Sequence, residues 1–240
     1  DIDAYRDIHF YHDLHRWTLA RDGAGRATAR ESEQLTHGWR AQQPDVSPDG
    51  DHVAFTVNHR GTTSLFEMSL TDRRPRALFR PRRFEQAYGP RYSPDGRTIA
   101  FSYWRAGGLR DVVLIDRATG RTRDVTRDAA IDMSPAFSPD GRWLVWSSDR
   151  SGVMNLYARE VRGDGELGPL RQVTNVVTGA FQPAVSPDGR TLVYVSYSQR
   201  GFDLARLPFD PARWRDPDEP FDDPFDREAA DAHASRPPPF

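Results

Sequence analysis

The chain has 240 residues, of which 37% are hydrophobic and 28% are charged, a composition typical of soluble globular domains. Its formal net charge of −2 gives no overall field that would favour nucleic acid or an anionic membrane. Cysteine is absent, which excludes disulfides and cysteine-ligated zinc, and no apolar run approaches the roughly 20 residues of a membrane helix. The sequence begins at Asp1 without a recognisable signal peptide, so we expect a removed leader or a longer parent protein.

The first 40 residues contain two short segments, 13–17 and 34–38, that favour β-strands. His9, His12 and His15 recur in this part at a spacing of three. That spacing would place them on one face of a helix, whereas in a strand they would alternate between the two faces. Because the flanking residues favour strand or irregular structure, we predict no metal site here.

The middle of the chain is an internal repeat. The tetrapeptide Ser-Pro-Asp-Gly occurs at 47–50, 93–96, 138–141 and 186–189, so the repeat period is 45 to 48 residues. A further proline precedes each serine by three residues: Pro44, Pro90, Pro135 and Pro183. Four copies in register predict a repeat architecture.

Each repeat contains material for up to four short strands. An apolar and aromatic run follows each glycine, at 53–55, 99–101, 144–146 and 192–194. A second run follows a polar loop, at 65–70, 112–115, 156–158 and 204–207, and three repeats offer another at 76–79, 123–126 and 171–174. The segment from proline to serine supplies the first strand of each unit. Four strands in a unit of this length predict the blade of a β-propeller.

The Pro-Asp-Gly step explains the tight turn between the first two strands. Proline presets φ, aspartate accepts a backbone hydrogen bond, and glycine takes a positive φ. These structural turn residues are Asp49, Gly50, Asp95, Gly96, Asp140, Gly141, Asp188 and Gly189. The aspartates could be imagined as calcium ligands, but each lies on a separate blade and the turn accounts for the residue type.

This pattern of Pro-x-x-Ser-Pro-Asp-Gly followed by apolar and aromatic residues resembles the TolB-type propeller repeat, and the resemblance extends over 41–207. It implies an all-β propeller of four-stranded antiparallel blades, usually six in number. Related propellers occur in the periplasmic protein TolB and in prolyl-oligopeptidase-like and tricorn-like proteases. With four repeat turns, we expect a partial leading blade at 1–40, propeller blades at 41–210 and an incomplete ring.

The last 30 residues differ in composition from the repeats. Proline and carboxylates dominate 211–240, and the apolar residues there show no periodicity. This composition predicts a linker or a disordered tail.

Two sets of side chains are candidates for binding. The loop arginines Arg60, Arg105, Arg150 and Arg200 recur between the second and third strands, which favours pairing within the blades, with a positive rim for an acidic partner as the alternative. Large or polar residues also precede each innermost strand: Trp39, Arg40, Gln42, Tyr88, Met133 and Phe181. We hypothesise that this face receives a peptide or protein segment, with Tyr88 and Phe181 as apolar anchors and Arg105 and Arg150 as charged contacts. The alternative is that these side chains plug the channel.

We find no catalytic motif in the sequence. It lacks a Gly-x-Ser-x-Gly elbow, a His-Glu-x-x-His pair and a phosphate-binding glycine loop, so we predict no catalytic residue and no cofactor. The leading hypothesis is a non-catalytic module for protein or peptide binding and scaffolding, without nucleic-acid binding, within a larger bacterial protein of the periplasm or cell envelope. A cytoplasmic location is the alternative. A rival hypothesis is the substrate-gating propeller of a peptidase whose catalytic domain lies outside this chain. A weaker one is a lyase-type propeller with a metal in its channel.

Overall fold

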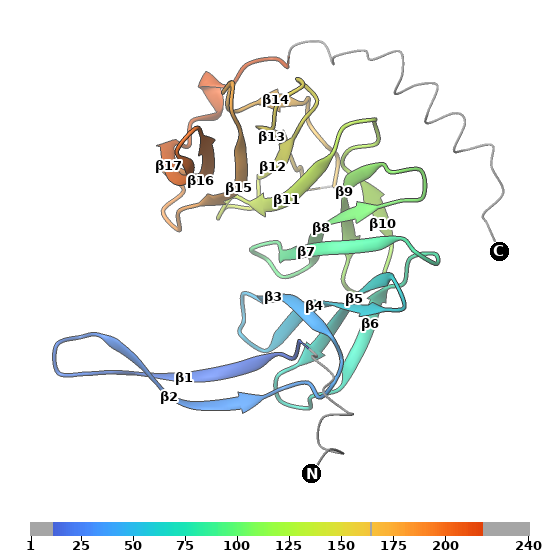
Figure 1. Cartoon of the computed structure of the whole chain (residues 1–240), viewed down its shortest axis with the longest axis vertical. Helices are drawn as coiled ribbons and strands as arrows, with labels where there is room; N and C mark the ends of the chain where they lie inside the picture. The colour runs from blue at the N-terminus through green and yellow to red at the C-terminus, as the bar shows by residue number, and fades with distance from the viewer. Residues whose placement is uncertain (1–11, 164, 218–240) are drawn as a thin grey trace.

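The computed structural model describes residues 12–163 and 165–217. These residues form β-strands joined by turns, with one short 3₁₀ helix and no α-helix among them, so none of them forms a helix that could cross a membrane. The strands make four consecutive repeat units, called here blades 1 to 4, that follow one another in an arc (Figure 1). The predicted all-β propeller architecture is confirmed.

A two-stranded hairpin precedes the blades. Strands β1 (His15–Arg21) and β2 (Ala27–Gln34) pair antiparallel and project away from the blades (Figure 1). The prediction of a strand at 34–38 is wrong, because β2 and its pairing with β1 end at Gln34. The side chain of Asp13 instead accepts hydrogen bonds from Thr36 Oγ1 at 2.7 Å and from the backbone N–H of Gly38 at 2.7 Å, which turns this stretch into a capped loop.

Blades 1 and 2 each have four antiparallel strands. Blade 1 contains β3 (Ala41–Val46), β4 (His52–His59), β5 (Thr62–Ser69) and β6 (Pro75–Phe79). Blade 2 contains β7 (Gln86–Tyr92), β8 (Thr98–Trp104), β9 (Arg110–Asp116) and β10 (Thr122–Asp124). A single parallel pair, Thr63 with Gln86, joins these two blades into one continuous sheet.

Blades 3 and 4 are separate sheets. Blade 3 contains β11 (Asp132–Phe137), β12 (Trp143–Ser148), β13 (Asn155–Glu160) and β14 (Arg171–Gln172). Blade 4 has three described strands, β15 (Ala180–Val185), β16 (Thr191–Ser198) and β17 (Gly201–Pro208). The outer edge of β17 therefore pairs with no described strand.

The chain after β17 returns to blade 3. A 3₁₀ helix at Pro211–Arg213 leads to Trp214, which is buried against Trp143 and Phe209. Arg215 then exchanges two backbone hydrogen bonds with Gln172, at 2.9 and 3.0 Å. The predicted start of a loose tail at residue 211 is therefore wrong, because the tryptophan anchors residues up to 216 on blade 3; residues 218–240 lie outside the described part.

Alternating residues of each second strand pack on two different neighbours. In β4, Phe55 faces the core shared with the leading segment, whereas Ala54 faces the core shared with blade 2. The same division places Trp146 of β12 against blade 2 and Val145 against blade 4. Stability is therefore carried by contacts between consecutive blades, as in other repeat proteins.

The four Ser-Pro-Asp-Gly turns share one hydrogen-bond pattern. All four turn glycines have the predicted positive φ, between 68° and 77°. In blade 1 the hydroxyl of Ser47 donates to Asp49 and accepts from the backbone N–H of His52 at 2.9 Å. The serine hydroxyl thus ties both sides of the turn together, a role that the prediction had not assigned to it.

Candidate functional site

A β-bulge interrupts every innermost strand at the same place. The register shifts between Gln42 and Asp45 in β3, and at the equivalent positions of β7, β11 and β15. The residue before the proline takes a left-handed conformation in each case, with φ between 49° and 55° at Gln43, Gly89, Ser134 and Gln182. A bulge bends its strand and redirects the neighbouring side chain. The proline thus occupies a bulge as well as an edge, the two places in a sheet that tolerate a missing N–H.

One variable position lies directly before each bulge. It is occupied by Gln42, Tyr88, Met133 and Phe181, on the face opposite the Ser-Pro-Asp-Gly turns. The fold therefore brings three of the predicted binding residues to equivalent positions of consecutive blades. Met133 is half-buried, as are Tyr88 and Phe181, so each offers only part of its surface.

Neighbouring groups hold the two aromatic members of this set. The guanidinium of Arg110 lies over the ring of Tyr88, 4.8 Å from its centroid. Burial raises the pKa of the Tyr88 hydroxyl and lowers the pKa of Arg110. Phe181 contacts Phe202 of β17 edge to face, with ring centroids 6.2 Å apart. Trp39 lies at the edge of the set and packs edge to face on Phe66, 5.7 Å between centroids.

The loop arginines divide into two pairs. Arg150 is almost fully buried, and its Nη2 lies 3.0 and 3.1 Å from the two carboxylate oxygens of Asp132. Arg105 forms ion pairs with Asp111 and Asp124 and stacks on Tyr103. These two arginines hold loops of their own blades, as the pairing interpretation expects, whereas Arg60 and Arg200 are exposed.

Burial shifts the pKa values of the carboxylates in these ion pairs. Burial raises the pKa of Asp111 to about 6, and the nearby Arg105 only partly offsets this effect. Burial also raises the pKa of Asp132, against the opposing charge of Arg150. This network joins the end of blade 2 to the start of blade 3, because Asp128 of the connecting segment also pairs with Arg150 at 3.3 Å.

The described residues give no support to a metal centre. Within 12–163 and 165–217, no group of three or more His, Asp or Glu side chains could hold a metal ion. His9 lies outside the described residues. The turn aspartates each accept hydrogen bonds within their own turn; Asp95, for example, accepts from Ser93 at 2.6 Å and from the N–H of Arg97 at 3.0 Å.

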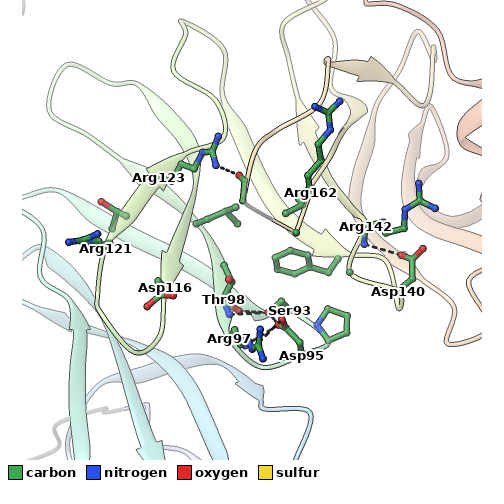
Figure 2. A pocket seen from close by; sticks show the side chains of 18 residues that line it. Ser93, Asp95, Arg97, Thr98, Asp116, Arg121, Arg123, Asp140, Arg142 and Arg162 are labelled. Carbon is green, nitrogen blue, oxygen red and sulfur yellow. Dashed lines mark hydrogen bonds and ion pairs between the residues drawn. The ribbon is translucent and has the colours of Figure 1, made fainter.

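A pocket lies on the face of the Ser-Pro-Asp-Gly turns, where the sequence analysis placed no candidate binding residue. It has a volume of about 880 Å³ and opens between blades 2 and 3, beside their Ser-Pro-Asp-Gly turns (Figure 2). Five exposed arginines line it: Arg97, Arg121, Arg123, Arg142 and Arg162. Arg97 and Arg142 directly follow the glycine of their motif, whereas Arg121, Arg123 and Arg162 come from β10 and the connections that precede β10 and β14. The motif alone therefore does not reveal the cluster.

Comparison with known proteins identifies the fold family. The family model described as the TolB beta propeller domain matches residues 82–215. The chain belongs to this family. A protein TolB homolog of Chlorobium luteolum is 31% identical over 126 residues, which are 51% of this chain and 27% of that protein. The Tol-Pal system protein TolB of Anaeromyxobacter dehalogenans is 35% identical over 94 residues, covering 39% of this chain and 21% of that protein.

Solved structures show the same architecture. TolB from Acinetobacter baumannii superposes with a TM-score of 0.64 at 19% identity, covering 80% of this chain and 46% of that one. A puromycin hydrolase superposes with a TM-score of 0.61 at 19% identity, covering 77% of this chain and 30% of that one. At this identity the structures establish the propeller fold alone. The match spans about a quarter of the length of the curated bacterial relatives.

Proposed function

We propose that this chain is a non-catalytic β-propeller module that binds a protein or peptide segment within a larger bacterial protein. The observation that carries the proposal is the repeated bulge, which presents a different side chain at the same position of each blade. A conserved backbone with variable side chains at one surface suits recognition, because the blades hold the side chains rigidly while their identities set the specificity.

The proposed contacts are Tyr88, Met133 and Phe181, with Trp39 at the edge. Large aromatic side chains and methionine are enriched at the centres of protein interfaces. Of the loop arginines, exposed Arg60 and Arg200 remain proposed charged contacts. Arg105 and Arg150 would act indirectly, by holding the loops beside these contacts.

A cell-envelope location of the larger protein is part of the proposal. It rests on the family and on relatives named for the Tol-Pal system. Fractionation of source cells with an antibody against this chain tests it, and a purely cytoplasmic signal would contradict it.

The binding function can be tested with selected ligands. Peptides selected from a display library against the purified chain should lose at least tenfold in affinity for Tyr88→Ala and Phe181→Ala. Arg190→Ala, an exposed change in the opposite turns, is the matched control. Ligands that lose affinity only for the control, with all variants folded, would contradict the choice of face.

The rival function is a substrate-gating propeller of a peptidase. Its motivation is that the puromycin hydrolase structure contains a propeller of the same fold. The complete open reading frame distinguishes the two proposals, because a gating propeller requires a catalytic domain in the same polypeptide.

A further inference from the structure

The arginine-lined pocket lies at one of three equivalent boundaries between blades. We call the boundary of blades 1 and 2 the first, that of blades 2 and 3 the second, and that of blades 3 and 4 the third. An arginine of the fourth strand holds the same register position at each of them: Arg76, Arg123 and Arg171. Its partner on the third strand pairs in turn with the residue seven positions after the motif serine. The surroundings of the three arginines can therefore be compared position by position.

The first boundary carries its own carboxylate. Glu67 is buried, and it accepts hydrogen bonds from Arg76 at 2.8 Å, from Arg117 of the connection after β9 at 2.5 Å and from the hydroxyl of Tyr92 at 2.9 Å. Burial raises the pKa of the Glu67 carboxyl, but the hydrogen bonds and charges of these partners outweigh it and leave the pKa below its usual value. The equivalent arginine at this boundary is therefore paired with an internal anion.

The third boundary receives a carboxylate from the chain after β17. Arg171 forms an ion pair with Asp216. Two residues earlier, Trp214 is buried against the rings of Trp143 and Phe209, with centroids 4.8 and 5.2 Å away. The residue between the two pairs with β14 through its backbone. An aromatic ring and a carboxylate, two positions apart on an added strand, thus occupy this boundary.

The second boundary keeps the arginine without a carboxylate. Arg123 donates a hydrogen bond to the carbonyl of Gly165 and pairs with no carboxylate among the described residues (Figure 2). Leu114 stands at the position of the buried glutamate of the first boundary, and Phe137 at the position of the tyrosine that donates to it. Both side chains line the pocket of about 880 Å³. Apolar groups have therefore replaced the polar partners at the one boundary where the arginine lacks an anion.

The pocket corresponds to the place of Trp214 at the third boundary. Trp143, which contacts that ring, is equivalent to Thr98, since each lies five residues after its motif serine. Phe209 is equivalent to Val161, because the backbone N–H of each donates to the residue four positions after its motif serine, at 2.8 and 2.7 Å. Thr98 and Val161 both line the pocket. The second boundary is thus open where the third holds a tryptophan.

The charges around the pocket also favour an anion. Its three aspartates accept hydrogen bonds within their own turns. Arg121 forms no ion pair with any residue that the structure describes, and Arg162 lies 3.7 Å from Glu160 and 3.9 Å from Glu166. Exposed pairs this long contribute little to stability, so these guanidinium groups can pair with a ligand at low cost.

We propose that the pocket between blades 2 and 3 binds a peptide segment of a partner protein that carries an aromatic residue two positions before a carboxylate. The ring lies on Leu114 and Phe137, and the carboxylate pairs with Arg123. The backbone between them adds to β10, which is the edge strand of its sheet. This site lies on the face opposite the proposed peptide-binding residues and does not rest on them.

A labelled nonapeptide tests the proposal. It has the sequence of residues 209–217 with Arg213→Ala and Arg215→Ala, so it keeps the tryptophan and the carboxylate of the third boundary and loses their positive neighbours. Titration into the full chain, followed by fluorescence polarisation, should show saturable binding. Replacing the tryptophan of the peptide by alanine, or its last aspartate by asparagine, should weaken binding at least tenfold. No saturable binding, or equal binding of the control peptides, would overturn the proposal.

Protein variants show whether the pocket is the site. Arg123→Gln should weaken binding at least tenfold, because glutamine can still donate to the carbonyl of Gly165 but carries no charge. Arg121→Glu/Arg162→Glu, an exposed reversal at the rim, should act in the same direction. Arg190→Gln, at an exposed arginine in the turn of blade 4, is the matched control and should leave the affinity unchanged. Affinity that ignores both pocket variants would overturn the assignment.

Two further variants separate this site from the others. Arg171→Gln should leave the affinity unchanged; if it weakens binding and Arg123→Gln does not, the peptide has displaced the chain at the third boundary and the proposal is wrong. Tyr88→Ala should also have no effect. A loss for Tyr88→Ala alone would place the peptide on the opposite face, which would overturn this inference and support the proposed function.

Discussion

The third strands of blades 3 and 4 hold leucine at the same register position, yet with opposite exposure. Leu156 of β13 pairs with Ser147, and Leu204 of β17 pairs with Val195. Each partner lies nine residues after the serine of its turn motif, at Ser138 and Ser186. Leu156 is 0% exposed, whereas Leu204 is 79% exposed. The two strands are alike, and the difference in exposure comes from their neighbours. Blade 3 lies between two blades, whereas blade 4 packs only on blade 3 within the described fold.

The exposed face of blade 4 extends beyond that leucine. Phe202 is 69% exposed and Tyr197 is 44% exposed, and their rings contact each other at 4.9 Å between centroids. The repeat sequence therefore encodes a strand, and an adjacent blade buries the apolar side chains of that strand in a core.

We expect the largest loss of stability when the buried ion pair of blade 3, between Arg150 and Asp132, is removed. Arg150→Ala leaves Asp132 buried without its charged partner and should lower the free energy of unfolding by about 3 to 5 kcal/mol. Arg200→Ala, in the corresponding exposed loop of blade 4, should change it by less than about 0.5 kcal/mol. Urea unfolding followed by tryptophan fluorescence measures both, and equal losses of stability would contradict the buried role of Arg150.

The second-largest difference in stability should separate the two leucines at the same register position, Leu156 and Leu204. Leu156→Ala should destabilise by about 2 to 5 kcal/mol because it removes buried surface and leaves a cavity. Leu204→Ala should cost less than about 0.5 kcal/mol in the same urea experiment. A large loss for Leu204→Ala would show that another part of the molecule covers the far face of blade 4 in solution.

The buried carboxyl of blade 2 should make stability depend on pH. The pKa of Asp111 is about 6 in the folded state against 3.8 in the unfolded chain, so between these values the folded state holds a proton that the unfolded state has lost. The contribution of Asp111 to stability should therefore fall by about 1 to 3 kcal/mol as the pH rises from 4 to 7.

The measurement is the difference in unfolding free energy between wild type and Asp111→Asn across that pH range. Asp203→Asn is the matched control, since Asp203 occupies the same register position in β17 and is exposed. A difference for Asp111→Asn that stays flat with pH would contradict the burial effect.

We expect the smallest loss of stability from alanine at the turn glycines, and it should be equal in blades 3 and 4. Gly141 and Gly189 have φ of 71° and 69°, and an added Cβ would meet only Pro94 at 3.6 Å in the first case and nothing within 4 Å in the second. Alanine at either position should cost about 1 kcal/mol through backbone strain alone. Thermal melts that differ strongly between the two variants would indicate that the turn also depends on its neighbour.

The Ser-Pro-Asp-Gly motif was sufficient to predict most of the fold. Its proline, aspartate and glycine act within one turn, so the turn glycines and the strands around them could be located from sequence alone. The leading hairpin and the chain after β17 were predicted less well. Asp13 and Trp214 act through partners far along the chain, Gly38 and Trp143, and no local pattern announces such contacts.

The repeat, the strand content and the turns follow from local sequence, because they depend on backbone preferences within a few residues. Only the tertiary structure decided which arginines are buried, since Arg150 and Arg200 follow similar strands and differ in the carboxylates that the neighbouring segments bring to them. It also decided where the arginine-lined pocket lies, because the pocket forms where the Ser-Pro-Asp-Gly turns of blades 2 and 3 meet the connections that precede β10 and β14. Contacts between blades join residues about one repeat apart, and that distance along the chain is why sequence patterns do not show them.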